Sequence, residues 1–325
     1  MRASELDYDL PPELVAQHPP ARRDASRLLV ADRASGGVRH RTFSDLPDEV
    51  AGYLTVVNDT RVVPARLELR RESGGGAEVL LLEPLGGGEW EALARPSRRL
   101  RAGERLRARD RAGDTVSLAP VVELLEALGE GRWRVRVEGE PRGELPLPPY
   151  IRERPEDPDR YQTVYAREAG SAAAPTAGLH FTPELLARLD HERITLHVGL
   201  DTFRPLTSDV VEEHELHGER YRVEPAAWAR IEAAGRVLAV GTTTTRVLES
   251  LARGAPLEGR SELFITPGCA FRRVDALLTN FHLPRTTLLA LVMAFAGVER
   301  TRELYELAIR ERYRFYSFGD AMLVL

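Results

Sequence analysis

One short segment of the chain combines a histidine with a helix-start signal. Residues 175–182 read Pro-Thr-Ala-Gly-Leu-His-Phe-Thr, and Pro183 and Glu184 follow. Threonine can cap the free N–H groups of a helix start, and proline is tolerated at the first helical position. We therefore expect His180 beside a helix N-terminus, where backbone donors and the helix dipole favour negative charge. Such a placement suits a site that handles carboxylates, phosphates or developing negative charge.

A second segment, Val240 to Arg246, places a glycine and four threonines between a predicted strand and a predicted helix. The glycine turn, the hydroxyls and the free N–H groups of a helix start can bind an anionic or nucleotide-like ligand. The alternative is a threonine-rich helix cap without a ligand. The segment is neither a Walker loop nor a dinucleotide fingerprint. The chain also lacks a Gly-x-Gly-x-Gly turn after a strand, which counts against a Rossmann-type methyltransferase or dehydrogenase.

Three further segments place polar side chains at predicted strand ends, and they are residues 58–66, 195–205 and 279–284. Loops at the carboxyl ends of parallel strands line the ligand crevice of an open α/β sheet. These blocks could therefore converge on one crevice. The alternatives are an Asx turn at Asn58 and Asp59 and a hydrogen-bonded core histidine at His197.

Two observations concern charge and metals. Eight arginines lie between Arg95 and Arg111, in a chain of net charge −5 that contains no lysine. Arginine suits bidentate phosphate contacts and stacking on bases, and the alternative is a solvated arginine-rich face. His214 and His217 are three residues apart, with the single cysteine, Cys269, far away in the sequence. This spacing is poor for metal ligation, so we predict no metal site.

Short strands are predicted in the first part of the chain, at 27–31, 38–43 and 53–57. After residue 150 the chain alternates predicted helices and strands. The helices are 183–189, 225–234, 243–253, 286–295 and 301–312, and the strands are 194–198, 221–223, 237–240, 263–266 and 276–280. Alternation of this kind favours an α/β layer with a largely parallel sheet. Residues 288–295 are apolar all round, which is typical of a core helix.

Between residues 61 and 149 the pattern changes to short strands and glycine-rich turns. Strands are predicted at 62–69, 77–82, 90–95, 104–109, 115–118 and 132–137, and residues 121–128 fit a strand or a helix. This pattern favours an antiparallel barrel or sandwich. The predicted fold class is α/β: a mixed, largely parallel sheet with flanking helices, interrupted by an inserted small antiparallel β-barrel domain. The predicted boundaries are 1–60 and 150–325 for the α/β domain and 61–149 for the barrel.

The composition excludes several classes of protein. The 325 residues are 43% hydrophobic and 29% charged, as in an ordinary globular protein. One cysteine excludes an internal disulfide framework, and the N-terminal residues lack the apolar core of a signal peptide. The longest apolar stretch, Leu288 to Val298, is too short to span a bilayer. We therefore expect a cytoplasmic protein.

Taken together, these segments resemble one family, the S-adenosylmethionine:tRNA ribosyltransferase-isomerases of queuosine biosynthesis. The matching stretches occur in family order and are residues 8–17, 24–29, 58–67, 143–151, 161–165, 175–182, 195–205, 240–250, 275–289 and 313–323. Several are long and unusual, so the resemblance does not rest on one motif. The chain departs from the family at Asp201, where glycine is usual, and this places a carboxylate close to the predicted pocket.

The resemblance implies a particular reaction. The ribosyl unit of S-adenosylmethionine moves onto the aminomethyl group of a 7-deazaguanine at the tRNA wobble position. It rearranges to an epoxycyclopentanediol, and adenine and methionine are released. S-adenosylmethionine is then a consumed substrate, and no cofactor is expected. Family members are usually described as monomers, with an α/β domain and an inserted β-barrel.

The resemblance also implies roles for individual residues. A base must remove a proton from the carbon next to the sulfonium, and histidine suits this because its ordinary pKa of about 6.5 lies near working pH. His180 is the first choice, followed by His197 and His282, and Asp59 is a candidate acid, base or ribose ligand. The substrate-binding candidates are Asn58, Arg61, Arg66, Thr182, Thr202, Phe203, Arg204, Gly241, Thr242, Thr243, Arg246 and Asn280.

The tRNA partner requires a local positive field, because the whole chain is acidic. We predict that the arginine cluster supplies it through Arg98, Arg99, Arg101 and Arg105, mostly by contacts with phosphates. Two other classes stay open from the sequence alone. One is an RNA-binding protein that has lost the reaction, and the other is an ordinary methyltransferase, which would leave no free adenine.

Overall fold

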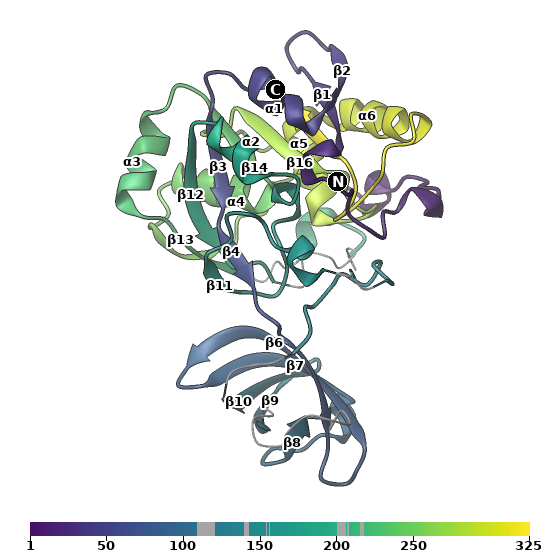
Figure 1. Ribbon diagram of the computed structural model, residues 1–325, viewed down its shortest axis with the longest axis vertical. Coiled ribbons are helices and arrows are strands. Elements are labelled where there is room, and N and C mark those ends of the chain that lie inside the picture. Colours follow the sequence, from purple (N-terminus) through teal and green to yellow (C-terminus); the bar gives the residue numbers. More distant parts are fainter. Residues whose placement is uncertain are drawn as a thin grey trace. The chain divides into compact units, whose positions relative to one another are not determined.

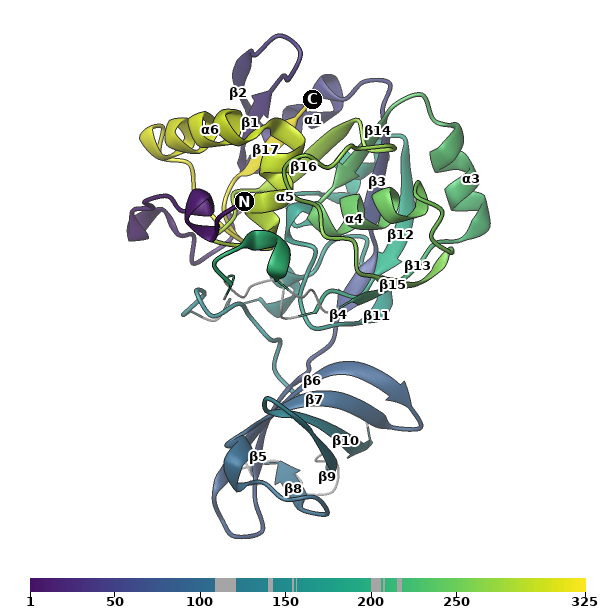
Figure 2. The same cartoon turned by 180° about the vertical axis from the view of Figure 1, so that it is seen from behind.

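The computed structural model describes residues 1–108, 121–139, 143–153, 155, 157–199, 206, 208–214 and 218–325. They form two compact units (Figures 1 and 2). The first comprises Met1–Thr60, Pro148–Glu168 and Ala174–Leu325, and the second comprises Arg61–Leu147 and Ala169–Ala173. The predicted strand at 115–118 and the candidates Asp201, Thr202, Phe203, Arg204 and His217 lie outside the described residues.

The first unit is built on a nine-stranded mixed sheet. In spatial order its strands are β15 (Glu258–Ser261), β13 (Glu219–Arg222), β12 (His191–Leu196), β3 (Leu54–Asn58), β14 (Val237–Val240), β16 (Ala276–Asn280), β17 (Ala321–Val324), β1 (Arg27–Ala31) and β2 (Val38–Thr42). Strands β12, β3, β14 and β16 pair in parallel, as do β17 and β1, whereas the other pairs are antiparallel. A mixed sheet with a parallel centre was predicted, and the structure confirms it.

Helices cover both faces of this sheet, so its central strands are buried along their whole length. Leu238 and Val240 of β14 point into an apolar cluster with α1 (Leu46–Glu49) and α2 (Pro183–Ala187). Side chains alternate along a strand, so the intervening residues of β14 face the opposite side. There α4 (Thr242–Leu251) packs, together with α5 (Thr287–Ala296) (Figure 2). The remaining helices are α3 (Pro225–Ala233) and α6 (Val298–Arg310).

The helix-start signals in the sequence correspond to real caps. The Thr182 hydroxyl accepts a hydrogen bond from the Leu185 N–H at 3.1 Å, and the Thr286 hydroxyl accepts one from the Leu289 N–H at 3.3 Å. Each cap satisfies a backbone donor that lacks a partner within its helix. The helix that Thr182 caps is only five residues long and ends at Arg188, its C-cap residue.

Two features of the sheet differ from the prediction. The strand predicted at 263–266 is wrong, and the edge strand β15 lies at Glu258–Ser261 instead. This edge strand is held by pairing with β13, and its own sequence has no apolar alternation. The carbonyl of Leu263 accepts a hydrogen bond from the Arg246 side chain instead of joining the sheet. Strand β17, which lies between β16 and β1, was not predicted.

The second unit contains a closed six-stranded antiparallel barrel, in agreement with the prediction. Its strands in order are β10 (Arg132–Glu138), β7 (Glu89–Arg95), β6 (Gly76–Gly86), β5 (Arg66–Arg70), β8 (Arg105–Ala108) and β9 (Val121–Gly129). Along β10, Trp133, Val135 and Val137 are buried and alternate with residues that face outward. The segment 121–128, which fitted either a strand or a helix, is part of β9. A two-stranded sheet pairs β4 (Thr60–Val62) with β11 (Glu168–Ser171).

A buried carboxylate fastens the loop before β16 to helix α4. Glu249 is fully buried, and its two oxygens accept hydrogen bonds from the N–H groups of Arg272, Arg273 and Val274 at 2.9 to 3.1 Å. The guanidinium of Arg253, which lies in the turn just after α4, forms an ion pair with the same carboxylate. Every buried charge and donor in this cluster is thus satisfied, which is the condition for such a group to be stable inside a protein.

Among the described residues, no helix has the length and apolar composition needed to cross a membrane.

We predict that Glu249→Ala lowers the free energy of unfolding by about 3–5 kcal/mol, because it leaves a guanidinium and three backbone donors without their acceptor. Chemical denaturation monitored by circular dichroism measures this change. Glu306→Ala is the matched control, since Glu306 is exposed on α6 and should change the free energy by no more than about 0.5 kcal/mol. Equal stabilities of the two variants would contradict the role given to Glu249.

Candidate active site

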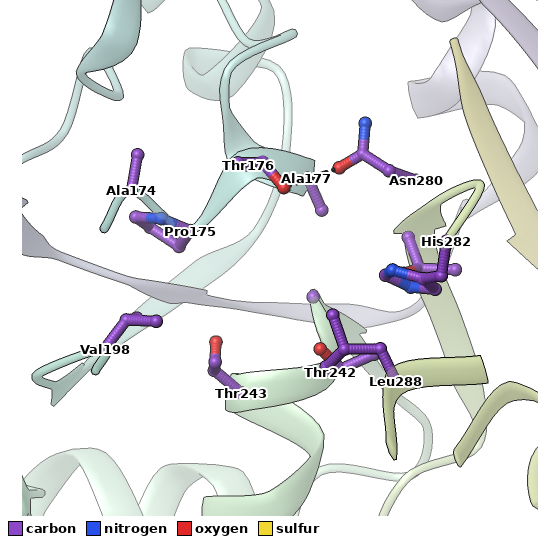
Figure 3. Close-up of a pocket in the computed structure, with 12 residues that line it drawn as sticks. Ala174, Pro175, Thr176, Ala177, Val198, Thr242, Thr243, Asn280, His282 and Leu288 are labelled. Atoms are coloured by element: carbon purple, nitrogen blue, oxygen red, sulfur yellow. Dashed lines mark hydrogen bonds between the residues drawn. The ribbon is translucent and has the colours of Figure 1, made fainter. Parts of the chain in front are cut away.

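A pocket opens in the first unit where the parallel strands β14 and β16 end (Figure 3). Crevices at the carboxyl ends of parallel strands are the usual ligand sites of open α/β sheets. The pocket contains about 370 Å³ of space, its opening to solvent included. It is lined by Ala174, Pro175, Thr176, Ala177, Val198, Gly241, Thr242, Thr243, Thr279, Asn280, His282 and Leu288.

The floor of the pocket is the start of helix α4. Gly241 joins β14 to this helix with φ +90°, a conformation that favours glycine. No side chain caps the helix, and within the described residues the N–H groups of Thr242, Thr243 and Thr244 have no hydrogen-bond acceptor. The hydroxyls of Thr244 and Thr245 bond to the carbonyls of Val240 and Gly241. The helix therefore presents unpaired backbone donors at its positive end.

Thr242 and Thr243 differ from the two threonines that follow them. Both side chains line the pocket, and each residue is only 6% exposed. Neither hydroxyl has a hydrogen-bond partner among the described residues. Figure 3 shows the Thr243 hydroxyl directed from the helix start into the space below Pro175. These two hydroxyls are thus available to a ligand.

On the opposite side of the pocket, Asn280 links the pocket to His180. Its Oδ1 accepts a hydrogen bond from the Thr176 hydroxyl at 2.9 Å, and its Nδ2 lies 3.2 Å from His180 Nε2. The other nitrogen of His180 lies 2.9 Å from the hydroxyl of buried Ser26, and its ring packs against Phe43. His180 does not line the pocket. Both of its ring nitrogens lie within hydrogen-bond distance of protein groups, Ser26 and Asn280.

His282 is the histidine that lines the pocket. It follows β16, and its Nε2 lies 2.7 Å from the hydroxyl of Thr279 on that strand. Its Nδ1 has no hydrogen-bond partner among the described residues, and Figure 3 shows the ring nitrogens turned toward the pocket. The backbone on either side of the ring is fixed, because the His282 N–H donates to the Tyr305 hydroxyl and its carbonyl accepts from Tyr8.

Burial sets the protonation state of both histidines. Desolvation lowers the pKa of His282 from 6.5 to about 3. It lowers the pKa of His180 to about 3 as well, helped by the positive charges of Arg314 and Arg23. Desolvation disfavours the charged form of an imidazole. Both rings are therefore neutral at physiological pH, and a neutral ring carries one nitrogen lone pair that can accept a proton.

Asp59 follows β3 and is buried apart from the pocket lining. Its Oδ1 accepts a hydrogen bond from the Thr195 hydroxyl at 2.7 Å. Its Oδ2 accepts none from the described residues, although the Arg167 guanidinium lies 3.0 Å away. Burial raises the pKa of Asp59, and the Thr195 hydrogen bond and the Arg167 charge oppose this shift. Asp59 thus has one oxygen that accepts a hydrogen bond and one that forms an ion pair without hydrogen-bond geometry.

Several predicted site residues serve the fold in this structure. Asn58 clamps β3 to β12 through hydrogen bonds of 2.9 and 3.0 Å to the backbone of Leu196. Arg246 is held by an ion pair with Glu219 and by the carbonyls of Ser261 and Leu263. His197 Nδ1 lies 2.9 Å from the Thr60 hydroxyl. None of these three side chains lines the pocket.

The other predicted residues are not among those that line the pocket either. Thr182 caps α2, Arg61 is exposed in β4, and Arg66 begins β5 of the barrel unit. The pocket thus gathers Gly241, Thr242, Thr243, Asn280 and His282 from the predicted set. Sequence reasoning missed seven lining residues, which are Ala174, Pro175, Thr176, Ala177, Val198, Thr279 and Leu288. Five of them lie in the segments 175–182, 195–205 and 279–284, so those segments were themselves the signal. Leu288 was expected to be core, but it is the half-buried residue of α5 that faces the pocket.

The fold and the pocket define a class of protein, an α/β protein with a crevice at its parallel strand ends and a closed antiparallel barrel in a second unit. The chain belongs to the family described as queuosine biosynthesis protein, whose model matches residues 3–324. This confirms the resemblance that the sequence segments indicated.

Individual relatives match over their whole lengths. The S-adenosylmethionine:tRNA ribosyltransferase-isomerase of Rubrobacter xylanophilus is 54% identical over 100% of this chain and 98% of its own. That of Symbiobacterium thermophilum is 51% identical over 100% of both chains. The crystal structure of S-adenosylmethionine tRNA ribosyltransferase from Thermotoga maritima is similar, with 37% identity, a TM-score of 0.56 and coverage of 99% of this chain and 100% of that one.

The lowered pKa values of His180 and His282 predict how stability changes with pH. The unfolded chain binds protons on these histidines below about pH 6.5, whereas the folded protein does so only near pH 3. Their contribution to stability is therefore complete above pH 6.5 and is lost as the pH falls toward 3. Within this window each histidine adds a slope of about 1.4 kcal/mol per pH unit.

We expect His180→Asn and His282→Gln each to flatten this dependence by about 1.4 kcal/mol per pH unit between pH 6 and pH 4. Urea unfolding at a series of pH values measures the slope, and titration of the carboxylates is common to all variants. His18→Gln is the comparison variant, because it removes a histidine whose side chain is 57% exposed. Wild-type slopes in both buried variants would show that these histidines are not held neutral.

Proposed function

We propose that this chain is an S-adenosylmethionine:tRNA ribosyltransferase-isomerase. It transfers the ribosyl unit of S-adenosylmethionine to 7-aminomethyl-7-deazaguanine at the tRNA wobble position and forms epoxyqueuosine-tRNA, adenine and methionine. The observation that carries the proposal is the full-length likeness to relatives of that name at 51–54% identity. The supporting structural observation is a pocket of neutral polar groups at the strand ends. S-adenosylmethionine is consumed as a substrate, and the protein acts in the cytoplasm as a monomer without a cofactor.

The reaction begins with removal of a proton from the ribose carbon bonded to the sulfonium. In this proposal His282 is the base. Its ring is neutral, and when Nε2–H donates to the Thr279 hydroxyl the lone pair of Nδ1 faces the pocket. The positive sulfonium acidifies the adjacent C–H bond, so a weak base held in place can suffice. The order expected from the sequence, with His180 first, changes because His180 is occupied by Ser26 and Asn280.

His180 and Asn280 then act as positioning residues. Both ends of the Asn280 amide have hydrogen-bond partners. Its Oδ1 accepts from the Thr176 hydroxyl, and its Nδ2 donates to His180 and to the carbonyl of Asp320. This network holds Thr176, which lines the pocket, against the end of β16. Positioning of this kind matters because a misplacement of about 1 Å can cost about a hundredfold in rate.

Release of free adenine from S-adenosylmethionine in the presence of tRNA carrying the 7-aminomethyl-7-deazaguanine base tests the function. We expect stoichiometric adenine and methionine, with no methylated tRNA. His282→Ala should lower kcat by about 10²–10⁴-fold, the usual contribution of general base catalysis. The control is His18→Gln, a substitution at an exposed histidine outside the pocket.

Two outcomes would contradict the proposal. Transfer of the methyl group without free adenine would indicate an ordinary methyltransferase. Binding of tRNA without turnover in the wild-type protein would indicate an RNA-binding protein that lacks the reaction.

The tRNA partner is proposed to contact the arginine cluster of the barrel unit. Arg98 and Arg99 are exposed in the short turn Ser97–Arg99, and Arg101 is exposed just after it. Their side chains form no ion pair among the described residues. Arg105, by contrast, pairs with Glu138, which reduces its availability.

Other arginines of the same barrel are neutralised. The outward-facing arginines of β10 pair with glutamates on the neighbouring strands, as Arg134 does with Glu126 and Arg136 with Glu89. Three exposed arginines that form no ion pair within the described residues therefore gather around residues 98–101, which supports a role in phosphate contacts. The neighbouring carboxylate of Glu104 accepts the Arg101 backbone N–H and is paired with Arg71.

Charge reversal at two positions, in the double variant Arg98→Glu/Arg99→Glu, should weaken tRNA binding. It should also flatten the salt dependence of binding, because fewer counterions are released from the phosphates. Losing about two phosphate contacts lowers the slope of log K against log salt by nearly two. Filter binding at several salt concentrations measures both quantities. Arg310→Glu/Arg312→Glu makes the same change of net charge at exposed positions outside the cluster and is the control. Equal effects of the two double variants on tRNA binding would indicate that the arginine cluster is a solvated face without a specific role in binding.

A further inference from the structure

The start of α4 has an unusual set of unpaired groups. The helix is ten residues long, and the N–H groups of Thr242, Thr243 and Thr244 have no acceptor within the described residues. These residues are buried, with exposures of 6%, 6% and 0%. Buried helix ends are normally capped, because an unpaired buried donor costs free energy. Here the hydroxyls of Thr242 and Thr243, themselves unpaired, open onto the pocket beside those donors.

The other polar groups of the pocket are already committed. Asn280 and Thr176 bond to each other, and Thr279 bonds to His282. The lining residues carry no carboxylate and no arginine. Apart from His282 Nδ1, what remains for a ligand is a group of donors at the positive end of a helix dipole. Such a group attracts an anion or a cluster of acceptor lone pairs and repels a cation.

S-adenosylmethionine contains one group that matches. Its sulfonium and ammonium are cations, which the helix start would repel. Its adenine offers ring nitrogens that accept one hydrogen bond each and point in different directions. Its carboxylate has two oxygens with about four lone-pair sites, so it can accept from several converging donors at once.

We propose that the start of α4 is the subsite for the carboxylate of the methionine moiety, held by the backbone N–H groups of residues 242–244 and by the hydroxyls of Thr242 and Thr243. This inference rests on the proposed function and deepens it. The same pocket contains His282, so one bound molecule has its amino-acid end at α4 and its reacting carbon within the pocket. Arg61 and Arg66, two substrate-binding candidates from the sequence, are not among the residues that line the pocket.

The test compares inhibitors that differ in this carboxylate. S-adenosylhomocysteine carries it, and 5′-methylthioadenosine lacks the whole amino-acid end. Their inhibition constants are measured in the adenine-release assay, with tRNA present, for wild type and for Thr243→Val. We expect the variant to bind S-adenosylhomocysteine at least about tenfold less tightly, the usual loss for a hydrogen bond to a charged group. Its constant for 5′-methylthioadenosine should stay within about twofold of wild type, since that compound makes no such bond.

Matched variants separate the hydroxyl from the helix. Thr243→Ser keeps the hydroxyl and should bind both inhibitors as wild type does. Thr245→Val changes a threonine of the same helix whose hydroxyl bonds to the Gly241 carbonyl, and it should leave the ratio of the two constants unchanged. Thermal unfolding of each variant confirms that the protein is folded.

The backbone donors have their own test. Proline is tolerated at the first position of a helix and removes its N–H group. Thr242→Val removes the hydroxyl alone, whereas Thr242→Pro removes the hydroxyl and the N–H. We expect the proline variant to bind S-adenosylhomocysteine several-fold less tightly than the valine variant, with equal constants for 5′-methylthioadenosine.

Each contrary result has a distinct meaning. Equal weakening of both inhibitors in Thr243→Val would make the helix start a nucleoside subsite and overturn the inference. Unchanged constants for both, or no inhibition of wild type by either compound, would overturn it too. Weaker tRNA binding with unchanged inhibitor constants would assign the donors to an RNA phosphate. All of these outcomes leave adenine release by the wild-type protein intact, whereas absence of that release would refute the proposed function itself.

Discussion

The parallel pairing of β14 with β16 is the constraint on which the site depends. Leu238, Ala239 and Val240 pair in register with Ala276, Leu277 and Leu278. Both strands therefore end side by side, and the residues that follow them enter the same space. Gly241 then turns the chain into α4, and its N–H donates to the Leu278 carbonyl at 2.7 Å, which extends the pairing to the edge of the pocket. A slip of one residue would exchange the faces of these buried strands and separate the helix start from His282.

The polar groups around the pocket are expensive to bury, and the fold compensates for them unevenly. His180, Asn280 and Thr176 satisfy one another and Ser26, so that side of the pocket is rigid before any ligand arrives. The start of α4 is left unsatisfied, with buried N–H groups and hydroxyls that have no partner among the described residues. One side of the pocket thus has its hydrogen bonds formed within the protein, whereas the start of α4 has donors available to a ligand. This combination suits ligand binding. The ligand supplies the hydrogen bonds that the protein lacks, so the desolvation of those donors is already complete when it binds.

The two units differ in their charged groups. The pocket of the first unit has no charged side chain in its lining, and the groups there that can interact with a charge are a helix dipole and neutral donors. The barrel of the second unit carries many arginines, but most of those on β10 are neutralised by glutamates opposite them. Arg98, Arg99 and Arg101 differ because their side chains form no ion pair within the described part of the barrel, where the neighbouring Glu104 pairs with Arg71. A chain with a net charge of −5 can thus present a local positive surface to a polyanion.

The sequence by itself determined the fold class, the helix caps and the identity of the main polar segments. Periodicity and capping are local properties, so the helices after residue 225 and the strands 237–240 and 276–280 could be predicted from neighbouring residues alone. The edge strand Glu258–Ser261 could not, because its sequence has no apolar alternation and only its pairing with β13 holds it in the sheet. Which of several strand-end residues meet in the pocket was decided by the tertiary structure alone. Asn58, Arg246 and His180 are of residue types that often bind ligands. In this structure their side chains instead contact the Leu196 carbonyl, Glu219 and Ser26, respectively. The hydroxyls of Thr242 and Thr243 and the Nδ1 of His282 remain open to the pocket, because strand order and helix packing place no acceptor or donor of the described chain against these atoms.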